Sequence, residues 1–149
     1  MTVLTPQQIA ERCAAVLWPE DRAAQGMGIE LVAVGPGTIR ARMTVREDMA
    51  NSHGICHGGY IFAVADAAFA YACNSYNHSA VASGAEINFV APAQLGDVLT
   101  AHGHMRQQGR RSGVYDIEVT NQDGKLVALF RGRSTRIQGP IFKDGNDPS

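Results

Sequence analysis

The stretch Asn51-Ser52-His53-Gly54-Ile55-Cys56-His57-Gly58-Gly59-Tyr60-Ile61-Phe62-Ala63-Val64-Ala65-Asp66 passes from a polar, glycine-containing loop straight into an apolar segment. From Gly58 to about Ser75 the sequence has strong helix formers and no interior proline, which predicts a helix. The helix is apolar nearly all round, and such a helix in a soluble protein lies inside, covered by other elements. Its many alanines would let a curved sheet approach closely. The carboxylate of Asp66 interrupts this pattern and requires an explanation.

The regions before and after this helix predict strands. Residues 27 to 34 and 38 to 45 carry spaced apolar residues on either side of the turn signal Gly35-Pro36-Gly37, and so predict a hairpin. Four strands are expected after the helix, at residues 81–91, 97–108, 113–121 and 125–137, with Asp123-Gly124 as a tight turn. Together these segments predict an α+β domain, in which a long antiparallel sheet wraps around a central helix.

The two ends of the chain are expected to differ from this domain. A short amphipathic helix is predicted through Val16, because Thr5 can cap it and Pro6 suits its first position. We therefore divide the chain into an N-terminal helical segment at residues 1–24, a main domain at 25–138 and a flexible tail at 139–149.

The composition argues against several classes of protein. The chain has 149 residues, which fits one domain. With 13 Lys and Arg against 14 Asp and Glu, its net charge is -1. No global field therefore attracts nucleic acid or an anionic membrane. The longest apolar stretch, near residues 60–73, contains Asp66 and is too short to span a bilayer.

The chain is also expected to be cytoplasmic. Its first residues lack a basic segment followed by an apolar one and a cleavage site, so no secretory signal is predicted. The three cysteines, Cys13, Cys56 and Cys73, are odd in number and widely spread, which suits free thiols in a reducing compartment.

Gly58 and Gly59 lie where the loop becomes the helix. Their backbone N–H groups point out of the helix start, with the positive end of the helix dipole behind them. Glycine also lets a substrate approach the backbone without a side chain in the way. Such donors can polarise a carbonyl whose oxygen gains charge during attack.

Asp66 lies eight residues beyond Gly58, about 12 Å along a helix. A carbonyl held at Gly58 is therefore too far from Asp66 of the same chain. If two copies pair with these helices antiparallel across a two-fold axis, each Asp66 comes opposite the Gly58 of the other copy. The spacing thus predicts a homodimer with two shared sites.

A carboxylate in an apolar helix is costly unless it is hydrogen-bonded or used. Asp66 can serve as a nucleophile towards an acyl carbon or as a general base for water. Asn51 can orient that water or donate to the carbonyl, and His57 can brace the loop or donate to the substrate. Together these groups indicate acyl transfer to water, which needs neither a metal nor a diffusible cofactor.

Other interpretations of the same residues remain open. His53 and His57 with Cys56 resemble part of a zinc site, but no second cluster completes it. Cys56 could be a nucleophile if the helix start lowered its thiol pKa. Asp66 could also be a structural, hydrogen-bonded carboxylate, and His53 could merely stabilise the loop.

The same residues resemble a known family. The pattern Asn51, His53-Gly54, His57-Gly58-Gly59 and Asp66 is similar to the PaaI-type (phenylacetic acid degradation) thioesterases of the hotdog superfamily. The similarity covers roughly residues 25–138. It continues through Val81-Ala82-Ser83, Gln108-Gly109, Gly113-Val114-Tyr115-Asp116-Ile117-Glu118 and Val127-Ala128-Leu129-Phe130-Arg131-Gly132.

This resemblance implies a hotdog fold, dimers that pair into a homotetramer, and hydrolysis of acyl-CoA thioesters, in which CoA is part of the substrate. By position, Asp66 would be the nucleophile or general base. Gly58, together with Gly59, would be the oxyanion donor. Asn51 and His57 would be the polar partners near the thioester. The family's substrates are phenylacetyl-CoA and ring-hydroxylated relatives. Tyr60 and Phe62 would form walls of the substrate pocket. Ser83 would help to position the attacking water.

The phosphates of CoA require cations near the mouth of the pocket. Arg110 and Arg111 at a hairpin, and Arg131, Arg133 and Arg136 on the last strand, are the candidates. Alternation places Arg131 and Arg133 on one face of the strand and Arg136 on the other.

Two functions from different classes therefore remain. The first is an acyl-CoA thioesterase, and the second is a non-catalytic module that binds acyl-CoA. Asp66 and the glycine pair favour the enzyme, because a binding module has no need of a buried carboxylate beside a thioester. A hotdog hydratase is a third option, but its paired Asp and His are not evident in this sequence.

Overall fold

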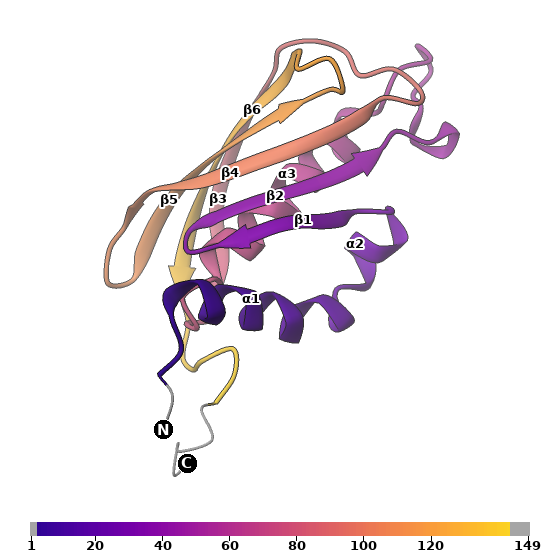
Figure 1. Ribbon diagram of the computed structural model, residues 1–149. Coiled ribbons are helices and arrows are strands. Elements are labelled where there is room, and N and C mark those ends of the chain that lie inside the picture. The colour runs from indigo at the N-terminus through magenta and orange to yellow at the C-terminus, as the bar shows by residue number, and fades with distance from the viewer. Residues whose placement is uncertain (1–2, 144–149) are drawn as a thin grey trace.

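A six-stranded antiparallel sheet curves around one long helix in the computed structural model, which describes residues 3–143 (Figure 1). The strand order is β1-β2-β4-β5-β6-β3. The strands are β1 (Glu30–Gly35), β2 (Thr38–Thr44), β3 (Ala80–Phe89), β4 (Val98–Gln108), β5 (Ser112–Thr120) and β6 (Leu126–Arg136). The predicted α+β architecture is therefore confirmed, with small differences at the strand ends.

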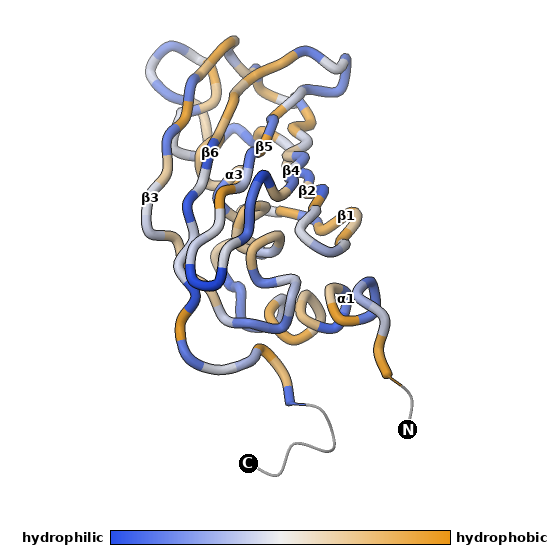
Figure 2. Tube along the Cα trace, turned by 90° about the vertical axis from the view of Figure 1, so that its left-hand side faces the viewer, coloured by the Kyte–Doolittle hydropathy of each residue, from blue (hydrophilic) through white to orange (hydrophobic). Residues whose placement is uncertain are grey.

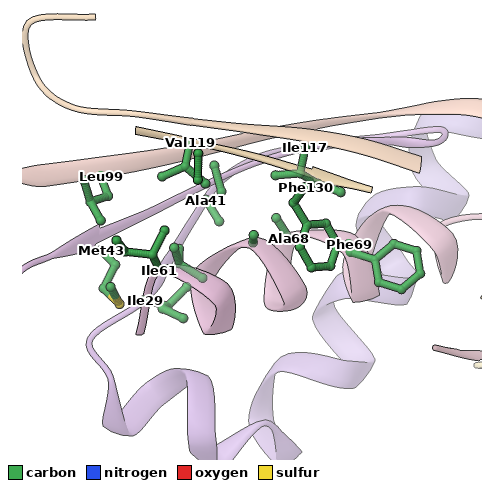
Figure 3. Close-up of a cluster of buried hydrophobic side chains, with 14 of the residues drawn as sticks. Ile29, Ala41, Met43, Ile61, Ala68, Phe69, Leu99, Ile117, Val119 and Phe130 are labelled. Carbon is green, nitrogen blue, oxygen red and sulfur yellow. The ribbon is translucent and has the colours of Figure 1, made fainter. Parts of the chain in front are cut away.

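The long helix α3 (Gly58–Cys73) contacts all six strands. Successive side chains of a strand point to opposite faces, so that Ile39, Ala41 and Met43 of β2 face the helix and are buried. Figure 3 shows Ile61, Ala68 and Phe69 of α3 within this core. The core thus lies between the concave face of the sheet and one side of α3.

One side of α3 is not covered by its own chain. Ala70 is exposed, and Phe62, Ala63, Asp66 and Ala67 are only partly buried. The helix is apolar nearly all round, as the sequence shows, yet a single chain covers only part of it. This open side is where a further element or a partner can pack.

The two edges of the sheet are covered differently. The helix α1 (Pro6–Leu17) runs beside β1, capped by Thr5 and Gln8 in a reciprocal pair of hydrogen bonds. A 3-10 turn, η1 (Trp18–Glu20), and a short helix, α2 (Arg22–Gly26), follow it. At the opposite edge lies β3 (Figure 2). Most of its residues are exposed.

The end of the described chain is attached to the rest of the fold. Asn77 has a left-handed backbone, with φ of 59°. Its side-chain oxygen accepts the N–H groups of Ile141 and Phe142, each at 2.9 Å. The Arg12 guanidinium lies 4.5 Å from the centre of the Phe142 ring. Of the predicted flexible tail, residues 139–143 are thus held in place, and residues 144–149 lie outside the described residues.

Two shorter features complete the description. The loop before α3 contains a 3-10 turn, η2 (Glu47–Met49). Within residues 3–143, no helix combines the length and the apolar character needed to cross a membrane.

Candidate active site

His57 forms the start of α3. Its Nδ1 atom accepts the Gly59 N–H at 3.3 Å, and its carbonyl accepts the Tyr60 N–H at 3.0 Å. Since Nδ1 is the acceptor, a neutral His57 carries its proton on Nε2, which remains a donor. The Gly58 N–H, in contrast, has no hydrogen-bond partner within residues 3–143. Of the two glycine donors expected from the sequence, only Gly58 is therefore available.

Asn51 organises the loop before the helix. Its Oδ1 atom accepts the N–H groups of His53, at 2.9 Å, and Ile55, at 3.3 Å. Its own backbone N–H donates to the Ile55 carbonyl at 2.8 Å. In the described part of the chain no partner is found for Nδ2. The side chain therefore offers donors to a ligand, while its acceptor is occupied by the loop.

Asp66 is half-buried on the open side of α3 and has no hydrogen bond or ion pair with any described residue. Burial raises the pKa of this carboxyl, and the negative charge of Asp21 raises it further. A carboxylate that served only the structure would be hydrogen-bonded. The structure thus gives no support to a purely structural role for Asp66.

A cleft of about 520 Å³ is lined in part by Gly58. Phe89, at the end of β3, covers Gly58 so closely that a Cβ at this position would lie 3.0 Å from the tip of the ring. The sequence alone did not single out Phe89, because its place over Gly58 depends on the path of β3. The residues lining the cleft are Asn51, Ile55, Cys56, Gly58, Ile61, Phe89, Val90, Ala91 and Pro92.

Three other expected substrate residues lie apart from this cleft. Tyr60 is partly buried against the core, and Phe62 makes an edge contact with Phe130, 5.3 Å between ring centres. Ser83 lies at a β-bulge between Ala82 and Gly84, and its hydroxyl donates to the Arg133 carbonyl at 3.1 Å. Within one chain, Ser83 makes no hydrogen bond with Gly58 or Asp66.

Four of the five expected arginines fall into two groups. Arg131 donates two hydrogen bonds to Asp116, at 2.7 and 2.9 Å, and lowers the pKa of that carboxyl. Arg133 lies 3.9 Å from Glu86, and both arginines are exposed on the outer face of the sheet. Arg110 and Arg111, at the β4–β5 turn, have no ion pair with any described residue.

The thiol and metal alternatives find little support. Burial raises the pKa of Cys56, whereas a nucleophilic thiol needs a lowered one. The side chain of His53 is exposed, and only its backbone N–H is engaged in the loop. Among residues 3–143 there is no group of three or more His, Cys, Asp or Glu side chains that could hold a metal ion.

A residue outside the expected set affects the pKa of Asp66. Asp21 follows the 3-10 turn η1, and its carboxylate accepts the Tyr71 hydroxyl at 2.9 Å. No motif in the sequence connects Asp21 with α3, since the contact spans 50 positions. Only the packing of the N-terminal segment against the helix reveals it.

Comparison with known proteins gives a consistent result. Residues 53–128 match the family model of the Thioesterase superfamily. The acyl-coenzyme A thioesterase PaaI of Escherichia coli (strain K12) is 48% identical over 128 residues, 86% of this chain and 91% of that protein. The family match includes the whole of α3 and the part of the preceding loop from residue 53 onward.

Solved structures agree with the sequence comparison. The PaaI protein from the phenylacetic acid degradation operon of E. coli superposes with a TM-score of 0.90 and 46% identity, over 91% of this chain and 99% of that one. A Streptococcus mutans protein bound to acetyl CoA has a TM-score of 0.72 and 29% identity, over 74% of this chain and 90% of that one. The expected hotdog fold is confirmed.

Proposed function

Since the chain belongs to the Thioesterase superfamily and is a thioester hydrolase, we propose that it hydrolyses phenylacetyl-CoA, or a ring-hydroxylated phenylacetyl-CoA, to the free acid and CoA. The related E. coli protein is named as an acyl-CoA thioesterase and comes from an operon for phenylacetic acid degradation. The related S. mutans protein binds acetyl CoA. These relatives support acyl-CoA as the substrate class.

The observation that carries this proposal is a pair of unused groups. The Gly58 N–H and the Asp66 carboxylate both lack a partner within the described chain. One is a hydrogen-bond donor at the positive end of a helix, and the other is a base in a partly apolar setting. This is the combination that attack on a thioester carbonyl requires.

The reaction can proceed by either of two routes. As a general base, Asp66 takes a proton from water while the water oxygen bonds to the acyl carbon. As a nucleophile, Asp66 bonds to that carbon itself, and water then cleaves the mixed anhydride. In both routes the C–S bond breaks, the sulfur leaves as a thiolate that takes up a proton, and the Gly58 N–H stabilises the negative oxygen.

Asn51 and His57 would act as donors beside this carbonyl. Because Asn51 Oδ1 is occupied by the loop, the Nδ2 hydrogens can bond the carbonyl or the water oxygen. The Nε2–H of His57 is a further donor. Neither residue needs to change protonation to act as a donor, and we propose no cofactor for this reaction.

Each active site would contain residues from two chains. The distance between Gly58 and Asp66, about 12 Å along the helix, is too long for one carbonyl. The open side of α3 and the exposed edge of β3, with Val81 at 47% and Phe89 at 54% exposure, lie where a second copy can pack. Antiparallel pairing of these surfaces would bring each Asp66 to the Gly58 of the partner, and Ser83 to the interface.

Two such dimers would form a tetramer, as the resemblance implies. Sedimentation or light scattering would measure a mass of four chains of 15.9 kDa. A monomeric, fully active enzyme would contradict the shared site. Gly58→Pro removes the N–H at the first helical position. Mixing Asp66→Asn chains with Gly58→Pro chains, each inactive alone, would restore activity only if each site contains residues of both chains.

The phosphates of CoA would bind arginines. Arg110 and Arg111, which have no ion pair with any described residue, are the first candidates. Arg131 and Arg133 already pair with Asp116 and Glu86, and these carboxylates would compete with the phosphates for them. Replacing Arg110 and Arg111 with Gln should raise KM for acyl-CoA. It should leave hydrolysis of a short thioester without phosphates unchanged.

The decisive experiment measures thiol release from a panel of acyl-CoA thioesters. We expect aryl-acetyl thioesters to give the highest kcat/KM, and Asp66→Asn to abolish most of it. If the wild type binds acyl-CoA but hydrolyses none, the chain is instead a binding module. If Asp66→Asn keeps the wild-type kcat, the role given to Asp66 is wrong.

A further inference from the structure

The loop that carries Asn51 and His57 is anchored at Met49, the last residue of the 3-10 turn η2. The Met49 side chain is fully buried, and its carbonyl accepts the His57 N–H at 2.7 Å. The Met49 N–H in turn donates to the Arg46 carbonyl at 3.0 Å. Because His57 begins α3, a displacement of η2 would also displace the donors at the start of this helix.

The side chain of Arg46 connects η2 with the short helix α2. Its Nε and Nη2 atoms donate to the two carboxylate oxygens of Asp48, at 3.1 and 3.4 Å, and its Nη1 atom donates to the Gly26 carbonyl at 2.9 Å. Gly26 is the last residue of α2. The final carbonyls of a helix lack partners within the helix, and the dipole is negative at this end. One guanidinium thus binds both η2 and the end of α2.

The other end of α2 is attached to α3. The Oδ1 atom of Asp21 accepts the Ala24 N–H at 3.2 Å, and its Oδ2 atom accepts the Tyr71 hydroxyl at 2.9 Å. Tyr71 is buried, with its ring 6.2 Å from the ring of Trp18. The helix α2 is therefore fixed to α3 at its start and, through Arg46, to the turn before α3 at its end.

Resting on the function proposed above, we propose that Arg46 is a positioning residue for thioester hydrolysis, which holds the loop at residues 51–57 in register with α3 by binding η2 to α2. Arg46 makes no hydrogen bond with Asn51 or His57. It therefore acts through the loop and not on the substrate. A displacement of reacting groups by about 1 Å can reduce the rate about 10²-fold, so a modest movement of the loop would be measurable.

The exposure of this ion pair separates positioning from stability. The side chains of Arg46 and Asp48 are 42% and 67% exposed, so water can replace their hydrogen bonds when either is removed. Exposed ion pairs contribute little to the free energy of folding. The position of the loop, in contrast, depends on both contacts of one planar group, whose donors point in fixed directions. Loss of Arg46 should consequently affect kcat more than Tm.

The test measures kcat, KM and Tm with phenylacetyl-CoA as the substrate. Arg46→Gln should lower kcat about tenfold, in keeping with a small displacement of reacting groups, and leave KM and Tm nearly unchanged. Arg46→Lys should lose less, because an ammonium group can reach one of the two partners but not both.

The matched control is Arg42→Gln. Arg42 lies on β2, its side chain is 48% exposed, and it pairs with Glu30 at 2.9 Å. It has no hydrogen bond with η2 or with the loop that follows. Removal of this ion pair should therefore leave kcat unaltered.

A double-mutant cycle with Asn51→Asp shows whether Arg46 acts through the loop. Asn51→Asp removes the Nδ2 donor, so that a displaced loop has less catalytic contribution left to lose. Residues of one network have non-additive effects. Arg46→Gln should therefore lower kcat by a clearly smaller factor in the Asn51→Asp background than in the wild type.

Three results would overturn the proposal while the wild type remains an active thioesterase: an unchanged kcat in Arg46→Gln, an equal loss in Arg42→Gln, or the same factor in both backgrounds of the cycle. A loss of kcat that accompanies a fall in Tm and disappears at lower temperature would also overturn it, since the role would then be purely structural. If the wild type hydrolysed no acyl-CoA, the function proposed above would fail, and this proposal with it.

Discussion

Asp66 and Asp97 are two aspartates that the fold treats in opposite ways. Asp97, before β4, is 9% exposed, and both its oxygens are bonded, to the Gln94 N–H at 2.8 Å and to Gln122 Nε2 at 2.9 Å. Asp66 lies among apolar residues on α3 without any such partner in the described chain. A carboxylate that maintains the fold is bonded by its own chain, whereas one kept for a reaction stays unbonded and costs stability.

The largest expected effect separates these two roles. Asp66→Asn should reduce kcat about 10³-fold, since general acid–base groups contribute about 10²–10⁴-fold. It should leave thermal unfolding unchanged or raise Tm. Asp97→Ala should keep kcat and lower the free energy of unfolding by about 1–3 kcal/mol, because the Gln94 N–H loses its acceptor. A loss of stability in Asp66→Asn, or a loss of kcat in Asp97→Ala, would contradict this division of roles between the two aspartates.

Asn51 repeats the same contrast within one side chain, since its oxygen serves the loop and its nitrogen does not. Asn51→Asp keeps the acceptor for the His53 and Ile55 N–H groups but removes the donor. We expect about a 10²-fold loss of kcat, the size typical of a lost oxyanion-hole donor, with nearly normal Tm. Asn51→Ala should lose activity and stability together. Equal effects of both changes on Tm would show that the oxygen does not support the loop.

Gly58 tests the close contact with Phe89. Gly58→Ala places a methyl group about 3.0 Å from the ring tip, so that the ring must move. We expect a fall in kcat/KM of about tenfold, in keeping with a small displacement of reacting groups. The double variant Gly58→Ala with Phe89→Ala should recover part of the loss. If the double variant is no better than Gly58→Ala alone, the ring is not the cause.

The smallest expected effect is a shift in pH dependence. Asp66 must be ionised to act, and its pKa is raised by burial and then by Asp21. Activity should therefore fall as the pH decreases through this raised pKa. Asp21→Asn removes one of the two causes, so the acid limb of kcat/KM should move to lower pH. Movement to higher pH, or none, would show that the charge of Asp21 is not felt at Asp66.

Most of the fold followed from local patterns. The glycine pair, the alanine-rich helix and the Asp123-Gly124 turn predict their elements because helix propensity and turn chemistry are properties of short segments. The short helix α2 and the 3-10 turns were not predicted as separate elements, because segments of three to five residues have too few positions to form a recognisable pattern. The sequence also did not show which side of α3 the sheet covers, because the helix is apolar on both sides.

The candidate site was predicted less completely. Gly58, Asn51, His57 and Asp66 belong to one continuous stretch, and their types indicated acyl transfer. The sequence did not show which of their hydrogen-bonding groups are already occupied. His57 Nδ1 accepts the Gly59 N–H, and Asn51 Oδ1 accepts N–H groups of the loop, whereas Asp66 has no hydrogen bond with any described residue. Phe89 reaches Gly58 from the end of β3, and Asp21 reaches Tyr71 of α3 from the N-terminal segment. Contacts between such distant parts of the chain leave no local signal in the sequence.

The hydrogen bonds from Asn77 to Ile141 and Phe142 have a practical consequence for engineering. They link the region just after α3 to the end of the described chain, and Phe142 in turn lies against Arg12 of the first helix. A truncation at residue 138 would remove these hydrogen bonds and the contact between Phe142 and Arg12, and would weaken the attachment of α1 to the domain. An affinity tag or a fusion partner is better joined beyond Lys143, where it leaves these contacts in place.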